Sequence, residues 1–187
     1  MTSDLTGSKI LVIATNYGVE QDEIVVPVHD LADRGATITV AATTTDPIQT
    51  LVGDKDPGKT VTPDILLDEA DAGDYDAIVV PGGTINADSI RREPGAIALV
   101  AAFADAGKPI AAICHGPWLL IESGVLPGRT ITSFPSLQTD VRNAGAEWVD
   151  REVEVDDSTG STIITSRNPD DLPAFVDAVS GALVPVA

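Results

Sequence analysis

The chain has 187 residues, a hydrophobic fraction of 43% and a formal net charge of −18, so it can bury a core and should repel nucleic acid and anionic lipid. No apolar run approaches the roughly 20 residues of a membrane helix, and the N-terminus lacks the basic segment of a signal peptide. We therefore expect a single domain over residues 1–187, located in the cytoplasm, with an acidic surface that is either ordinary or adapted to high salt.

Strands alternate with helices along the whole chain. In order, the patterns predict a strand over 9–14, a helix over 20–35, a strand over 36–42, a loop or small hairpin over 43–63, a strand over 75–80, a helix over 92–107, a strand over 108–113, a helix over 115–124, strands over 152–157 and 161–166, and a helix over 170–183. Pro27 predicts a kink or a late start in the first helix. Because several strands are continuous apolar runs, we expect an open α/β sandwich with a mostly parallel sheet covered on both faces.

The most informative stretch is "AAICHGPWLL" (111–120), in which a buried strand passes directly into a helix. Cys114 is the only cysteine, which excludes an internal disulfide and a zinc site built from several thiolates. At such an elbow a residue projects above the sheet edge, as a serine nucleophile does in hydrolases. The start of the following helix should favour a thiolate at Cys114, and His115 is adjacent.

Two further strand ends should meet Cys114 at the carboxyl edge of the sheet, where open α/β folds bind ligands. Glu20 follows the first strand, and Gly82 and Gly83 follow the strand over 75–80. The N–H groups of Gly83 and His115 could form an oxyanion hole, and Gly82 is a further candidate for oxyanion or substrate binding. A thiol, an imidazole, a carboxylate and a glycine turn are the groups needed for thiol chemistry on a carbonyl carbon.

Each of these residues also has a structural interpretation. A lone cysteine in an apolar strand is commonly a small buried hydrophobe. By residue type alone, Glu20 favours a helix N-terminus, and Pro-Gly-Gly is common turn punctuation.

Five segments together resemble the ThiJ/PfpI family, in particular its intracellular protease I and general stress protein branch. The segments are "NYGVEQDE", "DAIVVPGG", "AAICHGPWLLIESGVLPGR", "NAGAEWVDREVEVD" and "TSRNPDDLPAF". The resemblance implies a flavodoxin-like domain of the class I glutamine amidotransferase type. It also implies a homodimer or a hexamer built from dimers.

Carried over by position, the resemblance implies that Cys114 is the nucleophile and that Glu20 hydrogen-bonds its sulfur. His115 becomes the acid/base candidate, and Gly83 an oxyanion donor. In the protease branch, a carboxylate from an adjacent subunit reaches the histidine. The resemblance implies that Asp88 takes this role here. Its side chain is one methylene shorter than the glutamate of some members. Phe134 replaces a tyrosine of some members, so a hydroxyl is missing and efficient peptidase chemistry is in doubt.

The resulting hypothesis is a stress-related, cysteine-dependent hydrolase or lyase that acts on reactive carbonyls as a glyoxalase or deglycase. It needs no metal or organic cofactor, and its partners are a small carbonyl or peptide substrate and copies of itself. One alternative is an intracellular cysteine peptidase. The other is a non-catalytic stress protein, an oxidation sensor or chaperone, that uses Cys114. The fold alone does not decide among these functions.

Overall fold

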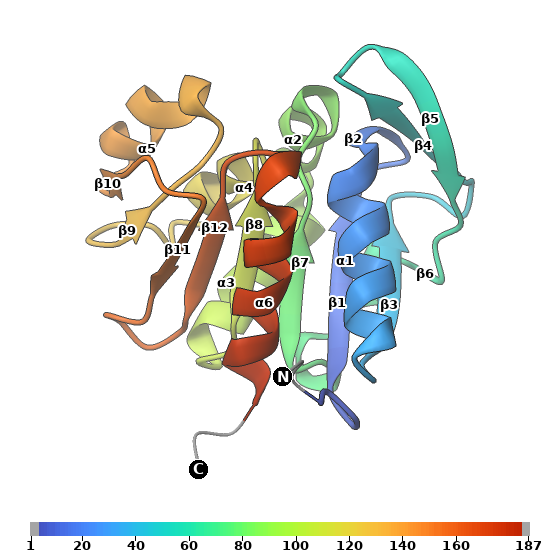
Figure 1. The fold of residues 1–187 in the computed structure, drawn as a ribbon, viewed down its shortest axis with the longest axis horizontal. Helices are drawn as coiled ribbons and strands as arrows, with labels where there is room; N and C mark the ends of the chain where they lie inside the picture. The colour runs from blue at the N-terminus through green and yellow to red at the C-terminus, as the bar shows by residue number, and fades with distance from the viewer. Residues whose placement is uncertain (1–3, 185–187) are drawn as a thin grey trace.

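A seven-stranded sheet lies between two layers of helices in the computed structural model, which describes residues 4–184 (Figure 1). The strand order is β11-β12-β8-β7-β1-β3-β6, and every neighbouring pair is parallel except β11 with β12. The predicted α/β sandwich with a mostly parallel sheet is thus confirmed.

The bounds of the elements follow the apolar pattern closely in the central strands. The strands are β1 (Lys9–Ala14), β2 (Tyr17–Glu20), β3 (Thr37–Ala42), β4 (Ile48–Val52), β5 (Asp56–Val61), β6 (Ile65–Leu66), β7 (Ala77–Val80), β8 (Ile110–Ile113), β9 (Thr130–Ile131), β10 (Glu147–Trp148), β11 (Val153–Asp156) and β12 (Ile163–Ser166). The α-helices are α1 (Gln21–Asp33), α2 (Thr84–Ile90), α3 (Pro94–Asp105), α4 (Pro117–Glu122), α5 (Gln138–Asn143) and α6 (Leu172–Leu183).

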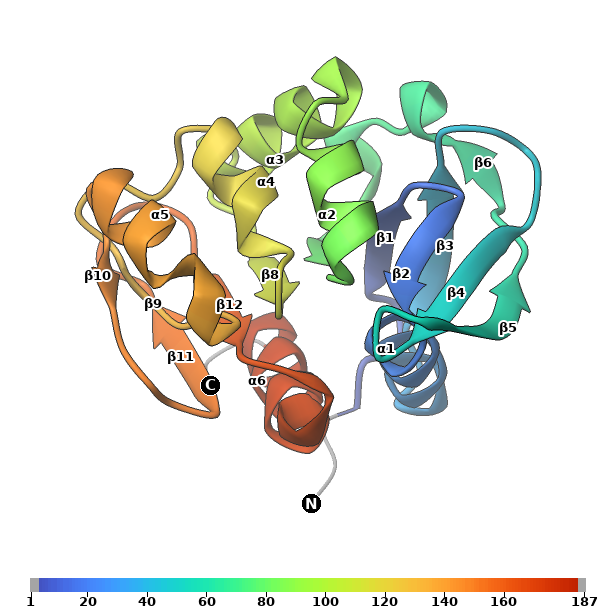
Figure 2. The ribbon, with the colours of Figure 1, turned by 90° about the horizontal axis from the view of Figure 1, so that it is seen from above.

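Helices α1 and α6 cover one face of the sheet, while α3 and α4 cover the other (Figure 2). Strand β1 shows the division, because its side chains alternate between the two faces. Ile10 and Val12 pack in the core beneath α1 and α6, and Leu11 and Ile13 pack in the core beneath α3 and α4. Both faces of the central strands are therefore buried, which explains why they read as unbroken apolar runs.

The structure resolves several elements that the sequence pattern left open. Residues 43–63 hold a hairpin, β4 with β5, which joins β2 in a separate three-stranded sheet. Helix α1 begins at Gln21 and runs through Pro27, so the expected late start is wrong. Helix α4 is shorter than predicted, and α2 was not predicted. No helix in the described range 4–184 is long and apolar enough to span a membrane.

Candidate active site

Cys114 lies at the elbow between β8 and α4, in a backbone conformation that L-residues rarely adopt. Its φ is +61°, one of only two positive values among the described non-glycine residues. Two hydrogen bonds hold it there. The Cys114 N–H donates to the carbonyl of Ser166 at 2.9 Å, and the N–H of Phe134 donates to the Cys114 carbonyl at 2.8 Å. The elbow is therefore fixed from both sides, and its side chain is 5% exposed.

The sulfur of Cys114 is surrounded by hydrogen-bonding groups. Nδ1 of His115 lies 3.1 Å from Sγ, so the two adjacent side chains do meet. The main-chain N–H groups of Gly83 and His115 donate to the sulfur and act to lower its pKa. The two main-chain N–H groups that the sequence suggested as oxyanion donors thus face the sulfur. A carbonyl oxygen brought to the sulfur would encounter the same two donors.

The carboxyl group beside the sulfur belongs to Glu23, and this corrects the role given to Glu20. Glu23 is fully buried, and its Oε2 accepts the N–H of Gly82 at 2.8 Å. Glu20 immediately precedes α1 and is half-buried, with Oε2 accepting the N–H of Asp54 at 3.2 Å. The physical reason is helical phase, because Glu23 shares the buried face of α1 with Ile24, whereas Glu20 stands outside the helix.

Burial dominates the protonation of this cluster. It raises the pKa of Glu23 to about 8, although the thiol of Cys114 and the N–H of Gly82 act in the opposite direction. It also raises the pKa of the Cys114 thiol, and the charge of Glu23 adds to that increase. Burial lowers the pKa of His115, against the charge of Asp54. Near pH 7 the site therefore holds a protonated carboxyl, a thiol and a neutral imidazole.

Activation of the thiol by the helix N-terminus stays a prediction, and the structure places little helix beside the sulfur. Helix α4 has only six residues and begins at Pro117, beyond the sulfur. Deprotonation instead has a local acceptor in the neutral ring of His115. A base within hydrogen-bond distance can take the proton as the sulfur attacks.

Gly82 and Gly83 have different tasks. The N–H of Gly82 is occupied by Glu23, so Gly82 orients the carboxyl group and is not the predicted oxyanion donor. Gly83 has φ +79° and precedes α2. A Cβ built on Gly83 would lie 2.2 Å from the carbonyl oxygen of Gly18, so only glycine fits this approach.

The variant Gly83→Ala should therefore lose about 2 to 4 kcal/mol of unfolding free energy, from backbone strain and overpacking. The matched control is Gly124→Ala, which also has positive φ (+71°) but meets nothing within 4 Å. It should lose only about 1 kcal/mol. Urea unfolding of the two variants measures the difference, and equal losses would show that the crowding at Gly83 is immaterial.

A pocket of about 270 Å³ opens over the sulfur. Its lining residues are Glu20, Glu23, Gly53, Asp54, Gly83, Cys114, His115, Phe134 and Pro169. Hollows of about 460 and 420 Å³ lie elsewhere, but Cys114 lines neither of them. The chemistry therefore identifies the smaller pocket as the candidate site.

Asp54 is a pocket residue that the sequence pattern did not reveal. It lies in the turn between β4 and β5, and its φ of +57° is the second positive value among the described non-glycine residues. Its carboxylate accepts the N–H and the hydroxyl of Thr84 at 2.8 and 2.6 Å. The hairpin is thereby tied to the start of α2. This contact joins two segments that are distant in the sequence, so no local sequence motif predicts it.

The ring of His115 is held by two residues of the segment that follows β9. Phe134 stacks on it with a centroid distance of 4.7 Å and an interplanar angle of 24°. Oγ of Ser136 lies 3.4 Å from Nε2. A hydroxyl is thus present on the far side of the imidazole, although position 134 lacks one.

Asp88 stands apart from this pocket. It is exposed on α2 and does not line the cavity of its own chain. It does not cap α2 either, because the N-cap position is Gly83. That Asp88 reaches the histidine of a neighbouring subunit stays a prediction. Within residues 4–184, no group of three or more His, Cys, Asp or Glu side chains is arranged to hold a metal ion.

Fold and site together define an open α/β protein with a cysteine at a strand-to-helix elbow, and comparison with known proteins agrees with that class. Residues 8–181 match the model of the DJ-1/PfpI family, and the chain belongs to this family. The resemblance inferred from the sequence motifs is confirmed.

Two relatives span nearly the whole chain. The deglycase TK1284 of Thermococcus kodakarensis is 39% identical over 168 residues, which are 90% of this chain and 95% of that protein. General stress protein 18 of Bacillus subtilis is 36% identical over 178 residues, covering 90% and 94%. The crystal structure of a ThiJ/PfpI domain protein from Brachyspira murdochii superposes with a TM-score of 0.86 over all of both chains at 22% identity, which supports the fold.

Proposed function

We propose that this protein is a stress-related deglycase or glyoxalase that uses Cys114 to attack reactive carbonyl compounds. The observation that carries the proposal is the convergence of Nδ1 of His115 and two main-chain N–H groups on one buried sulfur. The deglycase and stress-protein names of the full-length relatives support the same class of reaction.

The first step joins Sγ of Cys114 to the carbonyl carbon of methylglyoxal. The π electrons of the carbonyl bond move to its oxygen, which the N–H groups of Gly83 and His115 stabilise. The thiol proton passes to the neutral imidazole of His115 and then to this oxygen, which gives a hemithioacetal without net gain or loss of protons.

The second step moves hydrogen between the two carbons and produces a thioester on Cys114. His115 and Glu23 are the groups beside the sulfur that can relay this proton. Water then cleaves the thioester, returns the thiol and releases lactate, so the overall reaction converts methylglyoxal and one water into lactate. For an aminocarbinol adduct of methylglyoxal with an amine, Sγ displaces the amine from the aminocarbinol carbon and the thiol proton passes to the leaving nitrogen. This gives the same hemithioacetal and the free amine, and the later steps consume one water and release lactate.

Incubation of the wild type with methylglyoxal should yield lactate, and Cys114→Ala should reduce the rate by roughly 10³-fold or more because the nucleophile is absent. Phe134→Tyr is a companion variant that retains the nucleophile and should remain active. Cleavage of casein without lactate formation would instead favour the peptidase alternative. If Cys114→Ala still formed lactate and still cleaved casein at wild-type rates, Cys114 would have no role in either reaction.

A further inference from the structure

The pocket over Cys114 is negatively charged. Three carboxyl groups line it, those of Glu20, Glu23 and Asp54, whereas no Lys or Arg is among its lining residues. Glu23 is largely protonated near pH 7 because burial raises its pKa to about 8. The other two carboxyl groups, those of Glu20 and Asp54, are less buried and stand toward solvent.

These two carboxylates are fixed in place without being neutralised. Asp54 binds the N–H and hydroxyl of Thr84, and its own N–H donates to Oε2 of Glu20. All of these partners are uncharged. Among the described residues, neither carboxylate takes part in an ion pair. A charge held rigidly by neutral donors remains available to a ligand.

The buried part of the pocket also offers a polar atom without a partner. Oε1 of Glu23 has no hydrogen-bond partner among the described residues, although the side chain is fully buried. An unsatisfied buried polar atom is costly, and a polar group on a bound ligand would satisfy it.

We propose that this pocket selects carbonyl compounds that carry a positive charge, with Asp54 and Glu20 as specificity-determining residues. The proposal rests on the proposed function and narrows its substrate class to adducts in which a protonated amine or guanidinium lies a few bonds from the electrophilic carbon. Such a cation would face the two carboxylates while the carbonyl carbon reached Sγ. The carboxylate of an α-keto acid would be repelled by Asp54 and Glu20, so such a compound would be excluded from the pocket.

The only thiol of the chain is a probe of this charge, independent of turnover. Cationic 2-(trimethylammonium)ethyl methanethiosulfonate and anionic 2-sulfonatoethyl methanethiosulfonate both form a mixed disulfide with a thiol and release methanesulfinate. The ratio of their second-order rate constants with Cys114, divided by the same ratio for N-acetylcysteine amide, reports the local charge. Thiol reactivity itself cancels in this ratio.

The normalised ratio should be about 10 or more for the wild type at low ionic strength and should fall as salt is added. Asp54→Asn and Glu20→Gln should each lower it several-fold, and the double variant should bring it near 1. Both substitutions preserve an oxygen for the existing N–H donors. The matched control is Asp105→Asn, which removes one exposed charge at the end of α3 and should leave the ratio unchanged.

A wild-type ratio near 1, or a ratio that Asp54→Asn and Glu20→Gln leave unchanged, would overturn the proposal. Failure of the proposed function gives a different result. A charge-selective thiol in a protein that forms no lactate would refute the deglycase reaction and leave the cation preference standing. Lactate formation with a ratio near 1 would refute the cation preference alone.

Discussion

Glu23→Gln should make the protein markedly more resistant to unfolding at alkaline pH than the wild type. The wild-type carboxyl group has its pKa raised from 4.5 to about 8 by burial. Between these two values the unfolded chain releases the proton of Glu23 and the folded chain keeps it. The contribution of Glu23 to stability is therefore fully present below pH 4.5 and is lost as the pH rises through 8.

The size of this effect follows from the shift. One pKa unit corresponds to about 1.4 kcal/mol, so the pH-dependent loss for a fully buried group is on the order of 5 kcal/mol. Glutamine does not titrate, and its amide oxygen can still accept the N–H of Gly82. The unfolding free energy of the variant relative to the wild type should thus rise from pH 5 to pH 9.

Urea unfolding of both proteins at pH 5, 7 and 9 measures this difference. The same pair in a Cys114→Ala background removes the titration of the thiol and should keep the trend. Parallel pH profiles in both backgrounds would show that Glu23 is ionised in the folded protein. As a second readout, iodoacetamide should alkylate Cys114 with a lower pH midpoint in Glu23→Gln, because Glu23 raises the pKa of the thiol.

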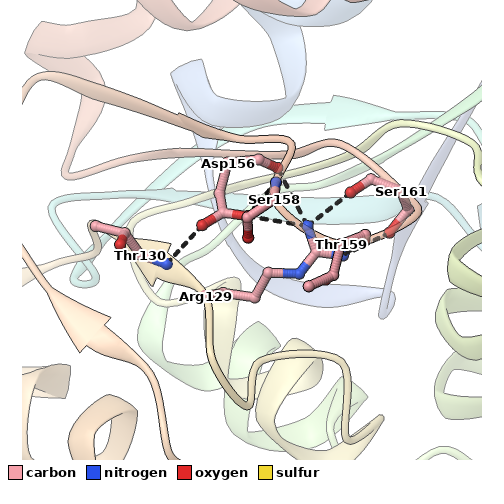
Figure 3. A network of polar contacts seen from close by, with 6 residues as sticks. All are labelled: Arg129, Thr130, Asp156, Ser158, Thr159 and Ser161. Atoms are coloured by element: carbon pink, nitrogen blue, oxygen red, sulfur yellow. Dashed lines mark hydrogen bonds and ion pairs between the residues drawn. The ribbon is translucent and has the colours of Figure 1, made fainter.

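Arg129→Met should cost about 3 to 5 kcal/mol of unfolding free energy, since it breaks a buried ion pair from one side. Arg129 is 4% exposed, and its Nη1 lies 3.1 Å from Oδ1 of Asp156 (Figure 3). The guanidinium also donates to the carbonyl oxygens of Thr159 and Ser161. Removal of the cation would leave both carbonyls and the carboxylate of Asp156, which is only 7% exposed, without this partner.

The Asp156 carboxylate is ionised in this network. Burial raises its pKa, but hydrogen bonds from Ser158, Thr130 and Arg129 outweigh that effect and lower it. The matched control is Arg151→Met, because Arg151 pairs with Glu154 at 2.8 Å but is 64% exposed. That variant should lose at most about 1 kcal/mol.

Urea unfolding of the two methionine variants tests the prediction, and equal losses would contradict it. Arg129→Lys keeps the charge but lacks the forked donor geometry, so it should fall between wild type and Arg129→Met. It serves as the measurable variant if the methionine protein does not fold.

The central sheet was predictable because each strand has a recognisable apolar pattern in its own short segment. Strands such as β1 and β8 are buried on both faces, so they read as continuous apolar runs. Helix α2 was not predicted because "TINADSI" is short and mostly polar and has no extended apolar stripe. The two-residue strands β9 and β10 carry no pattern of their own and pair only through tertiary contacts.

The sulfur, the imidazole and the oxyanion donors were predictable from a single rule, the convergence of strand ends at one sheet edge. The carboxyl partner was misassigned because the chain adds a short strand, β2, before α1 begins. Had the helix been started at Gln21, its period would have placed Glu23 on the same face as Pro27 and Leu31 and therefore inward. Asp54 could not be found this way, because its bond to Thr84 depends on how a separate hairpin docks.

The positive φ angles of Cys114 and Asp54 also bear on how the sequence can evolve. Among the described non-glycine residues these are the only two such angles, and both residues line the same pocket. Glycine would relax the backbone at either position. At position 54 that exchange would remove both hydrogen bonds to Thr84, and at position 114 it would remove the thiol itself. Relief of backbone strain at Cys114 therefore competes with retention of the thiol, while the remainder of the scaffold can drift toward higher stability without this conflict.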